Sequence, residues 1–113
     1  MAVRFETSDP EELLSRIRSA IDDSLIETWS YDHDGDFTHT ARQWVNEAWL
    51  RPSVSNNRLS FYIIPPQGKT ISRTVYAIYH GRFIEAVLSH FDHDFKRAIA
   101  TALPEGADRI KSA

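Results

Sequence analysis

The sequence predicts an α+β fold: a two-layer sandwich in which an antiparallel sheet of about four strands is flanked by an N-terminal helix and a long C-terminal helix. An amphipathic helical pattern opens the chain, and short segments rich in β-branched and aromatic residues occupy its middle. A longer apolar stripe with helical spacing follows. Short connections make neighbouring strands antiparallel, so the expected element order is α-β-β-β-β-α.

Length and composition exclude several classes of protein. The chain has 113 residues, near the commonest size of a single domain, so we expect one domain over 1–113. It has no cysteine, which excludes disulfides, thiolate zinc sites, iron–sulfur clusters and a cysteine nucleophile. Its formal net charge is -3 with both signs interspersed, which gives no basic footprint for a phosphate backbone. We therefore expect no nucleic-acid partner.

The chain also lacks long apolar runs. Residues Met1 to Glu6 do not form the apolar stretch of a secretory signal, and no segment approaches the roughly 18 apolar residues of a membrane span. We expect a soluble, cytoplasmic protein with no membrane partner.

The first helix is predicted from about 10 to 24. Ser8 or Asp9 can cap it, Pro10 is tolerated in its first turn, and the following glutamates favour the positive end of the helix dipole. Its buried face is marked by Leu13, Leu14, Ile17, Ile21 and Leu25.

A β-hairpin is predicted next, around Asp34 and Gly35, because an Asp-Gly pair between β-rich runs favours a type I′ turn. With these two as the loop, the register pairs His33 with Asp36, Tyr31 with Thr38, and Trp29 with Thr40. Residues 41–48 fit a short helix opened by Thr40 or, less well, a strand, and we leave both alternatives open. A strand from about 49 to 54 and one from 59 to 64 form a second hairpin around Asn56 and Asn57.

The last part of the chain is predicted as a strand and a helix. A return strand from 70 to 79 carries a near-continuous apolar run, and His80 and Gly81 end it. A long helix follows, with an apolar stripe from Ile84 to Ala102, and ends at Pro104. Residues 105–113 are expected to be a frayed tail. Both helices should pack on one face of the sheet and leave the other face for solvent or a partner.

The stretch from Trp29 to Trp49 is the candidate binding surface, because it holds all three tryptophans of the chain. Amphipathic aromatic side chains dominate the energetics of protein interfaces. The predicted binding residues are Trp29, Tyr31, His33, Asp36, Trp44 and Trp49. The acidic residues of the turn do not form a calcium loop, because the glycine is at the wrong position, and no metal or cofactor is expected.

A second candidate site lies at His80 and Arg82. If a strand ends there and a helix begins, the free N–H groups of the helix and Arg82 could hold an anion. An alternative function, from a different class, is a metal-dependent or His/Asp-based hydrolase that uses His33, Asp36, His39 and His80. That alternative requires these side chains to converge in one pocket.

The preferred function is a small non-enzymatic binding or regulatory module that recognises a protein partner through the aromatic-rich sheet and hairpin. No glycine-rich phosphate loop, nucleophile elbow or zinc-binding helix motif is present. Small size, acidity and the lack of cysteine would suit an immunity-type or antitoxin-like inhibitor. We also expect a homodimer or a heteromeric complex, because two helices cover only one face of the sheet.

Overall fold

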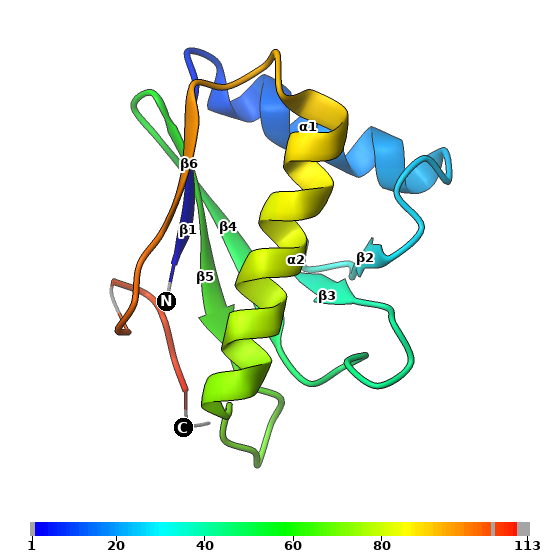
Figure 1. Ribbon diagram of the computed structural model, residues 1–113, viewed down its shortest axis with the longest axis vertical. Coiled ribbons are helices and arrows are strands. Elements are labelled where there is room, and N and C mark those ends of the chain that lie inside the picture. The colour runs from blue at the N-terminus through cyan, green and yellow to red at the C-terminus, as the bar shows by residue number, and fades with distance from the viewer. Residues whose placement is uncertain (1, 105, 111–113) are drawn as a thin grey trace.

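The computed structural model describes residues 2–104 and 106–110, and within them it confirms the α+β class. One antiparallel sheet has six strands in place of the predicted four or so, in the order β2-β3-β4-β5-β1-β6 (Figure 1). In chain order the elements are β1 (Val3–Glu6), α1 (Pro10–Asp22), β2 (Trp29–Tyr31), β3 (Phe37–His39), β4 (Trp49–Ser55), β5 (Arg58–Ile64), α2 (Arg73–Phe91) and β6 (Arg97–Ala100).

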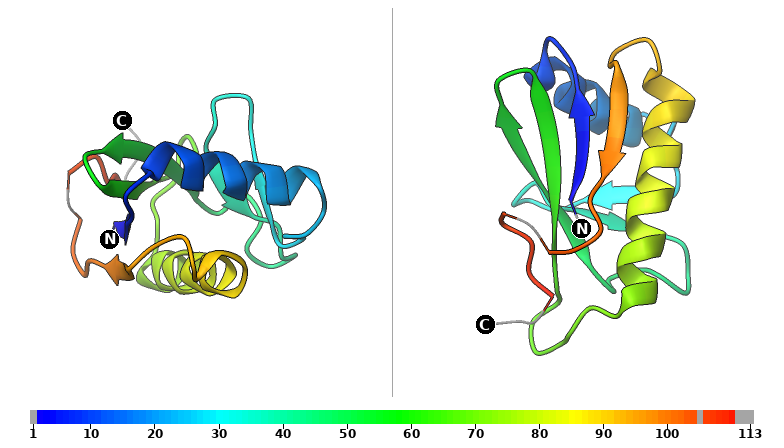
Figure 2. Two further views of the ribbon diagram at one scale, coloured as in Figure 1. Left: turned by 90° about the horizontal axis from the view of Figure 1, so that it is seen from above. Right: turned by 60° about the vertical axis from the view of Figure 1, so that its left-hand side comes forward.

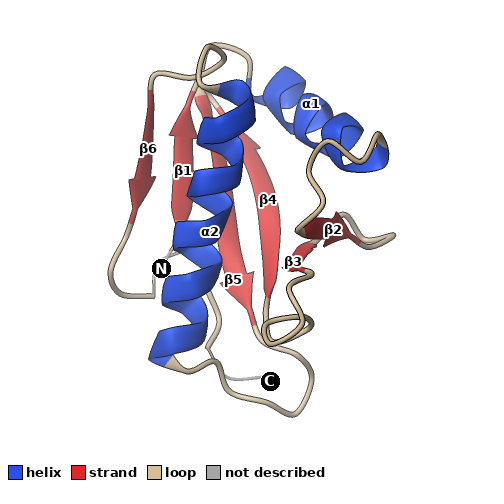
Figure 3. Cartoon of the chain, turned by 45° about the vertical axis from the view of Figure 1, so that its right-hand side comes forward, coloured by secondary structure: helices blue, strands red, loops and turns tan. Residues whose placement is uncertain are grey.

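The sheet has one buried face, which we call the inner face, and one solvent-facing outer face. Strand pairing places Val3, Phe61 and Pro52 side by side on the inner face, and Leu50 pairs there with Ile63. Both helices bury apolar side chains in the core that this face forms, among them Ile17 of α1 and, from α2, Tyr79, Phe83 and Val87. The prediction that both helices pack on one face is therefore confirmed. Helix α2 lies in front of the strands in Figure 3 and beside them in the right-hand view of Figure 2.

The first helix and the central hairpin form as predicted. The side chain of Asp9 accepts a hydrogen bond from the Glu12 N–H at 3.1 Å and caps α1. Strands β4 and β5 are joined by Asn56 and Asn57, and Ser55 pairs with Arg58. Asn57 has a φ of 59°, a left-handed conformation that asparagine tolerates better than most residues, which is why it suits this tight turn.

The β2–β3 hairpin forms, but its predicted register is wrong by one residue. Trp29 pairs with His39, and Tyr31 pairs with Phe37. The loop spans 32–36, because the Asp32 carboxylate accepts hydrogen bonds from the backbone N–H groups of Asp34 and Asp36, both at 3.0 Å. A shift of one residue exchanges the faces of a strand. Phe37, expected on the opposite face, therefore shares a face with Trp29 and Tyr31.

The prediction of a strand from 70 to 79 is wrong, because α2 begins at Arg73. The Ser72 hydroxyl accepts a hydrogen bond from the Val75 N–H at 3.1 Å and caps the helix. Tyr79, Phe83 and Val87 then recur every four residues and are buried. Helical packing against the sheet outweighs the β propensity of this segment.

The predicted helix is also too long at its C-terminal end. Helix α2 ends at Phe91, and the chain then forms β6, an edge strand that pairs with β1. Strand β1 had no counterpart among the predicted elements. It lies between β5 and β6, and its Phe5 contacts Phe61 and Phe83 at ring-centroid distances of 6.0 and 6.1 Å. These two strands account for the difference in strand number.

Two irregular segments complete the structure. Residues 41–48 form hydrogen-bonded turns, with the Trp44 N–H donating to the Ala41 carbonyl at 2.8 Å, so neither alternative for this segment is correct. Residues 106–110, part of the predicted tail, lie against β5. The N–H of Arg109 donates to the Ile63 carbonyl at 2.7 Å, and the Ile63 N–H donates to the buried Asp108 carboxylate at 2.8 Å. The rest of the predicted tail, residues 105 and 111–113, lies outside the described residues.

Candidate functional site: the outer face of the sheet

The structure places Trp29 in the interior, although it was predicted as part of a binding surface, and leaves Trp44 half-buried. Trp29 is only 2% exposed and stacks on His39 with ring centroids 4.8 Å apart. Trp44 packs against the core, and its carbonyl accepts a hydrogen bond from the Tyr79 hydroxyl. The Trp29 ring is therefore not accessible to a partner, whereas Trp44 is partly exposed.

Tyr31 and His33, two more of the predicted binding residues, lie at the hairpin end of the molecule. Tyr31 is partly buried, and its hydroxyl donates to the Asp22 carboxylate at 2.7 Å, a bond that raises the pKa of the tyrosine. Arg18 lies over its ring at 5.6 Å from the centroid. His33 projects from the loop with its side chain 92% exposed. Tyr31 is therefore held by neighbouring side chains and His33 extends into solvent, so the two do not form one site.

The exposed aromatic residues of the sheet gather on the outer face instead. Trp49 and Arg51 alternate along β4, and they pair directly with Ile64 and Tyr62 on β5. Directly paired residues of an antiparallel sheet have their Cβ atoms about 5 Å apart, so these four side chains form one contiguous surface. We call it the Trp49 patch, and its members are Trp49, Arg51, Tyr62 and Ile64. The tryptophan, the tyrosine and the isoleucine are partly exposed, and the arginine is exposed.

Asp36 fixes the arginine of this patch. Asp36 is 4% exposed. Its carboxylate accepts two hydrogen bonds from Arg51, one from Nε at 3.1 Å and one from Nη2 at 2.8 Å. Bidentate pairing of this kind orients a guanidinium more strongly than a single contact does. The hydrogen bonds to Asp36 raise the pKa of Arg51 above its ordinary value. Of the predicted binding residues, the structure therefore brings together Asp36 and Trp49, through an arginine between them.

The histidines of the alternative function do not assemble into one site. His39 is 1% exposed, with Nδ1 at 2.6 Å from the Thr28 carbonyl, and burial lowers its pKa. His80 is buried on α2 against its own helix backbone, with Nδ1 beside the Tyr76 carbonyl, and burial lowers its pKa as well. Within residues 2–104 and 106–110, no group of three or more His, Asp or Glu side chains could hold a metal ion.

The predicted anion site at His80 and Arg82 loses its physical basis. Both residues lie in the middle of α2, where the backbone N–H groups are used within the helix. No strand ends and no helix begins at that point. His80 is buried and Arg82 is exposed, so the two side chains differ in their access to solvent.

Arg51, Tyr62 and Ile64 were not among the predicted site residues, although part of the signal for them was available. The β4–β5 hairpin was predicted, and strand alternation from its two-residue turn places these positions on the face of Trp49. The contact between Arg51 and Asp36 could not be predicted from strand alternation. It depends on the five-residue loop and on the pairing of Phe37 with Leu50.

No protein-family model, curated protein or solved structure matches this chain. Within the part that the structure describes, neither helix is long and apolar enough to cross a membrane.

Proposed function

We propose that this protein is a non-enzymatic binding module that recognises another protein through the Trp49 patch. The observation that carries the proposal is the placement of a tryptophan, a tyrosine and an arginine as neighbours on the sheet face opposite both helices. Tryptophan, tyrosine and arginine are the residues most enriched among those that dominate binding energy at protein interfaces.

The geometry of the patch suits recognition for two further reasons. Its side chains stand on the paired strands β4 and β5, so little ordering is needed when a partner arrives. The Asp36 carboxylate holds the Arg51 guanidinium in one orientation, which reduces the entropy that the arginine would lose on binding. A partner surface with an apolar centre and an acceptor group facing Arg51 would complement it.

The buried state of the histidines supports binding over catalysis. A general base must reach the proton that it abstracts, and the rings of His39 and His80 are almost fully covered. Exposed His33 stands on a loop beside Asp34 at 3.6 Å, without a third group of the kind that orients a catalytic base.

The test is a quantitative capture experiment from the native host with three proteins: wild type, Trp49→Ala combined with Ile64→Ala, and a matched control. Both patch residues lie on the outer face, so the variant should fold, which thermal denaturation would verify. We expect the patch variant to lose at least about tenfold in affinity for the captured partner, the order of effect of removing an interface anchor.

The control variant combines Leu25→Ala with Arg42→Ala. It removes one apolar side chain, 65% exposed, and one exposed cation, both outside the Trp49 patch. It should bind as wild type does. Equal binding by all three proteins would refute the assignment of this surface, and light scattering on the same samples would show whether the partner is a second copy of the chain.

A further inference from the structure

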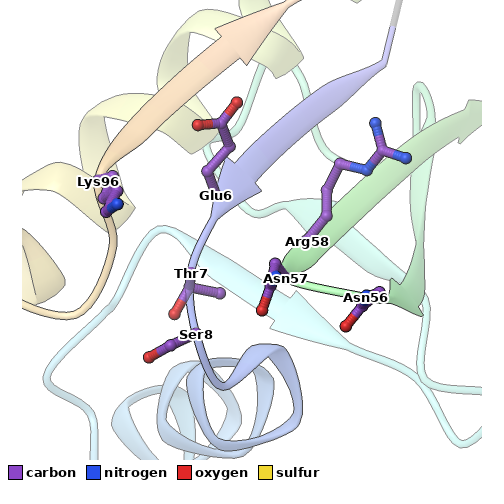
Figure 4. Close-up of a pocket in the computed structure, with 7 residues that line it drawn as sticks. All are labelled: Glu6, Thr7, Ser8, Asn56, Asn57, Arg58 and Lys96. Carbon is purple, nitrogen blue, oxygen red and sulfur yellow. The ribbon is translucent and has the colours of Figure 1, made fainter.

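A polar cleft lies at the opposite end of β4 and β5 from Trp49, where β1 leaves the sheet toward α1 (Figure 4). Its volume is about 460 Å³, within the range of pockets that bind small molecules. Three separate parts of the chain line it: the end of β1, the β4–β5 turn and the segment before β6. The lining residues are Glu6, Thr7, Ser8, Asn56, Asn57, Arg58 and Lys96.

Backbone hydrogen bonds hold the walls of this cleft in place. The Thr7 N–H donates to the Asn57 carbonyl at 3.1 Å, and the Lys96 N–H donates to the Glu6 carbonyl at 2.7 Å. The Thr7 hydroxyl donates to the Asp94 carbonyl at 2.8 Å. The three parts of the lining are therefore tied to one another, so the cleft is already formed without a ligand.

The charges in the cleft are unbalanced in favour of cations. Glu6 lies between Arg58 on β5 and Arg97 on β6 in the strand register, and its carboxylate pairs with Arg97 at 2.6 Å. Among the described residues, Arg58 and Lys96 have no acidic side chain within ion-pair distance. The lining thus carries two cations and one carboxylate, and that carboxylate is paired with Arg97, which is outside the lining.

The carboxylates beside the cleft are already engaged and do not supply a counter-charge to these cations. Asp9 caps α1 through the Glu12 N–H, and Asp94 pairs with Arg16 at 3.3 Å. The same arginine also binds Glu12 at 3.0 Å. The acidic groups at this end of the molecule are therefore held by partners of their own.

The neutral side chains of the cleft add donors. The hydroxyl of Ser8 and the amides of Asn56 and Asn57 make no hydrogen bond to any described residue. A serine hydroxyl and an asparagine amide can each donate and accept, whereas the two cations only donate. The free hydrogen-bonding capacity of the cleft is thus dominated by donors, which a ligand rich in acceptor oxygens would satisfy.

We propose that this cleft binds the oxyanion group, carboxylate or phosphate, of a small polar molecule. Arg58 and Lys96 supply the charge, and the neighbouring amides and hydroxyl hydrogen-bond the oxygens. The volume of the cleft exceeds that of an isolated phosphate, so the remainder of the molecule also lies inside it. This site does not depend on the Trp49 patch, and it has no residue in common with it.

The experiment is an NMR titration of the ¹⁵N-labelled full chain at constant ionic strength. One series uses inorganic phosphate and glucose 6-phosphate, and the other uses succinate. We expect saturable shifts of the side-chain amides of Asn56 and Asn57 and of the backbone amides of residues 6–8 and 96. The series that saturates at lower concentration identifies the preferred oxyanion.

Arg58→Gln and Lys96→Gln test the two cations, and Lys69→Gln, on an exposed lysine of the loop after β5, is the matched control. We expect each cleft variant to weaken binding by about fivefold or more, as the loss of a charge-assisted contact does, and the control to bind as wild type. The unchanged remainder of each spectrum would show that the variants fold. The proposal is overturned if neither series gives saturable shifts, or if the cleft variants bind as tightly as the control.

Discussion

From Phe61 to Ile64 of β5, consecutive residues differ in their exposure to solvent. Leu59, Phe61 and Ile63 point to the inner face and are fully buried, whereas Tyr62 and Ile64 point to the outer face and stay partly exposed. Phe61 contacts Phe83 of α2 at a centroid distance of 4.6 Å, within a cluster of edge-to-face rings. The outer face carries instead the Trp49 patch and ion pairs such as Glu6 with Arg97. One set of strands therefore forms the core with one face and carries the proposed binding surface on the other.

Aromatic content alone therefore does not identify a binding surface in this sequence. Trp29 and Trp49 belong to the same aromatic-rich stretch, but strand alignment places the first in the core and the second on the outer face. Burial of a whole ring in a packed interior stabilises the fold, while a ring left partly exposed on a rigid sheet can anchor a partner.

The largest expected effect comes from a matched pair of substitutions on this strand. Ile63→Ala should lower the free energy of unfolding by about 2–4 kcal/mol, because it opens a cavity in the core. Ile64→Ala, one residue further on the outer face, should lower it by about 1 kcal/mol or less. Urea denaturation of the two variants beside wild type gives both values. Equal losses would show that the two faces do not differ in their contribution to stability.

A smaller effect is expected at the ion pair that joins the hairpin loop to the outer face. Arg51→Ala leaves the buried Asp36 carboxylate without its bidentate partner and should cost about 1–3 kcal/mol of stability. Combining it with Asp36→Ala in a double-mutant cycle should give a coupling of about 1–2 kcal/mol.

The matched control for this pair is Arg58→Ala, an exposed arginine on the neighbouring strand, which should change stability by about 0.5 kcal/mol or less. A coupling energy near zero between Arg51 and Asp36 would mean that the carboxylate does not fix the guanidinium. The Arg51 guanidinium would then not be oriented before a partner binds.

The sequence predicts an element well where a few neighbouring residues, such as a helix cap or a turn pair, mark its end. Asp9 and Pro10 mark the start of α1, and the paired asparagines mark the β4–β5 turn, so both were predicted correctly. Strand β1 is different, because its partners β5 and β6 are distant in the sequence and four residues give a weak pattern. Its existence depends on pairing that a local pattern does not contain.

The first half of helix α2 was predicted as a strand for a related reason. Val75 and Tyr79 have side chains that favour strands, but they recur every four residues with Phe83 and Val87, and this spacing lets all four pack against the sheet as one helical face. Tertiary packing decided between the two conformations. At the candidate site, Trp49 was predicted from its residue type, whereas the link between Asp36 and Arg51 required the hairpin register. Side-chain alternation could be predicted, but the loop that shifts it by one residue could not.

The smallest expected effect is a pH dependence that arises on the inner side of the molecule. Burial lowers the pKa of His39, and its Nε2 atom is buried without a hydrogen-bond partner in the described residues, so protonation there is unfavourable. Burial lowers the pKa of His80 as well. The unfolded chain then binds protons that the folded chain does not, so stability present at neutral pH is lost as the pH falls below about 6.5.

We expect the urea midpoint to fall between pH 7.5 and pH 5.5, and His39→Gln to reduce that fall. His33→Gln, a substitution in the exposed loop, is the control and should retain the fall seen in wild type. A fall unchanged by His39→Gln would exclude His39 as its source.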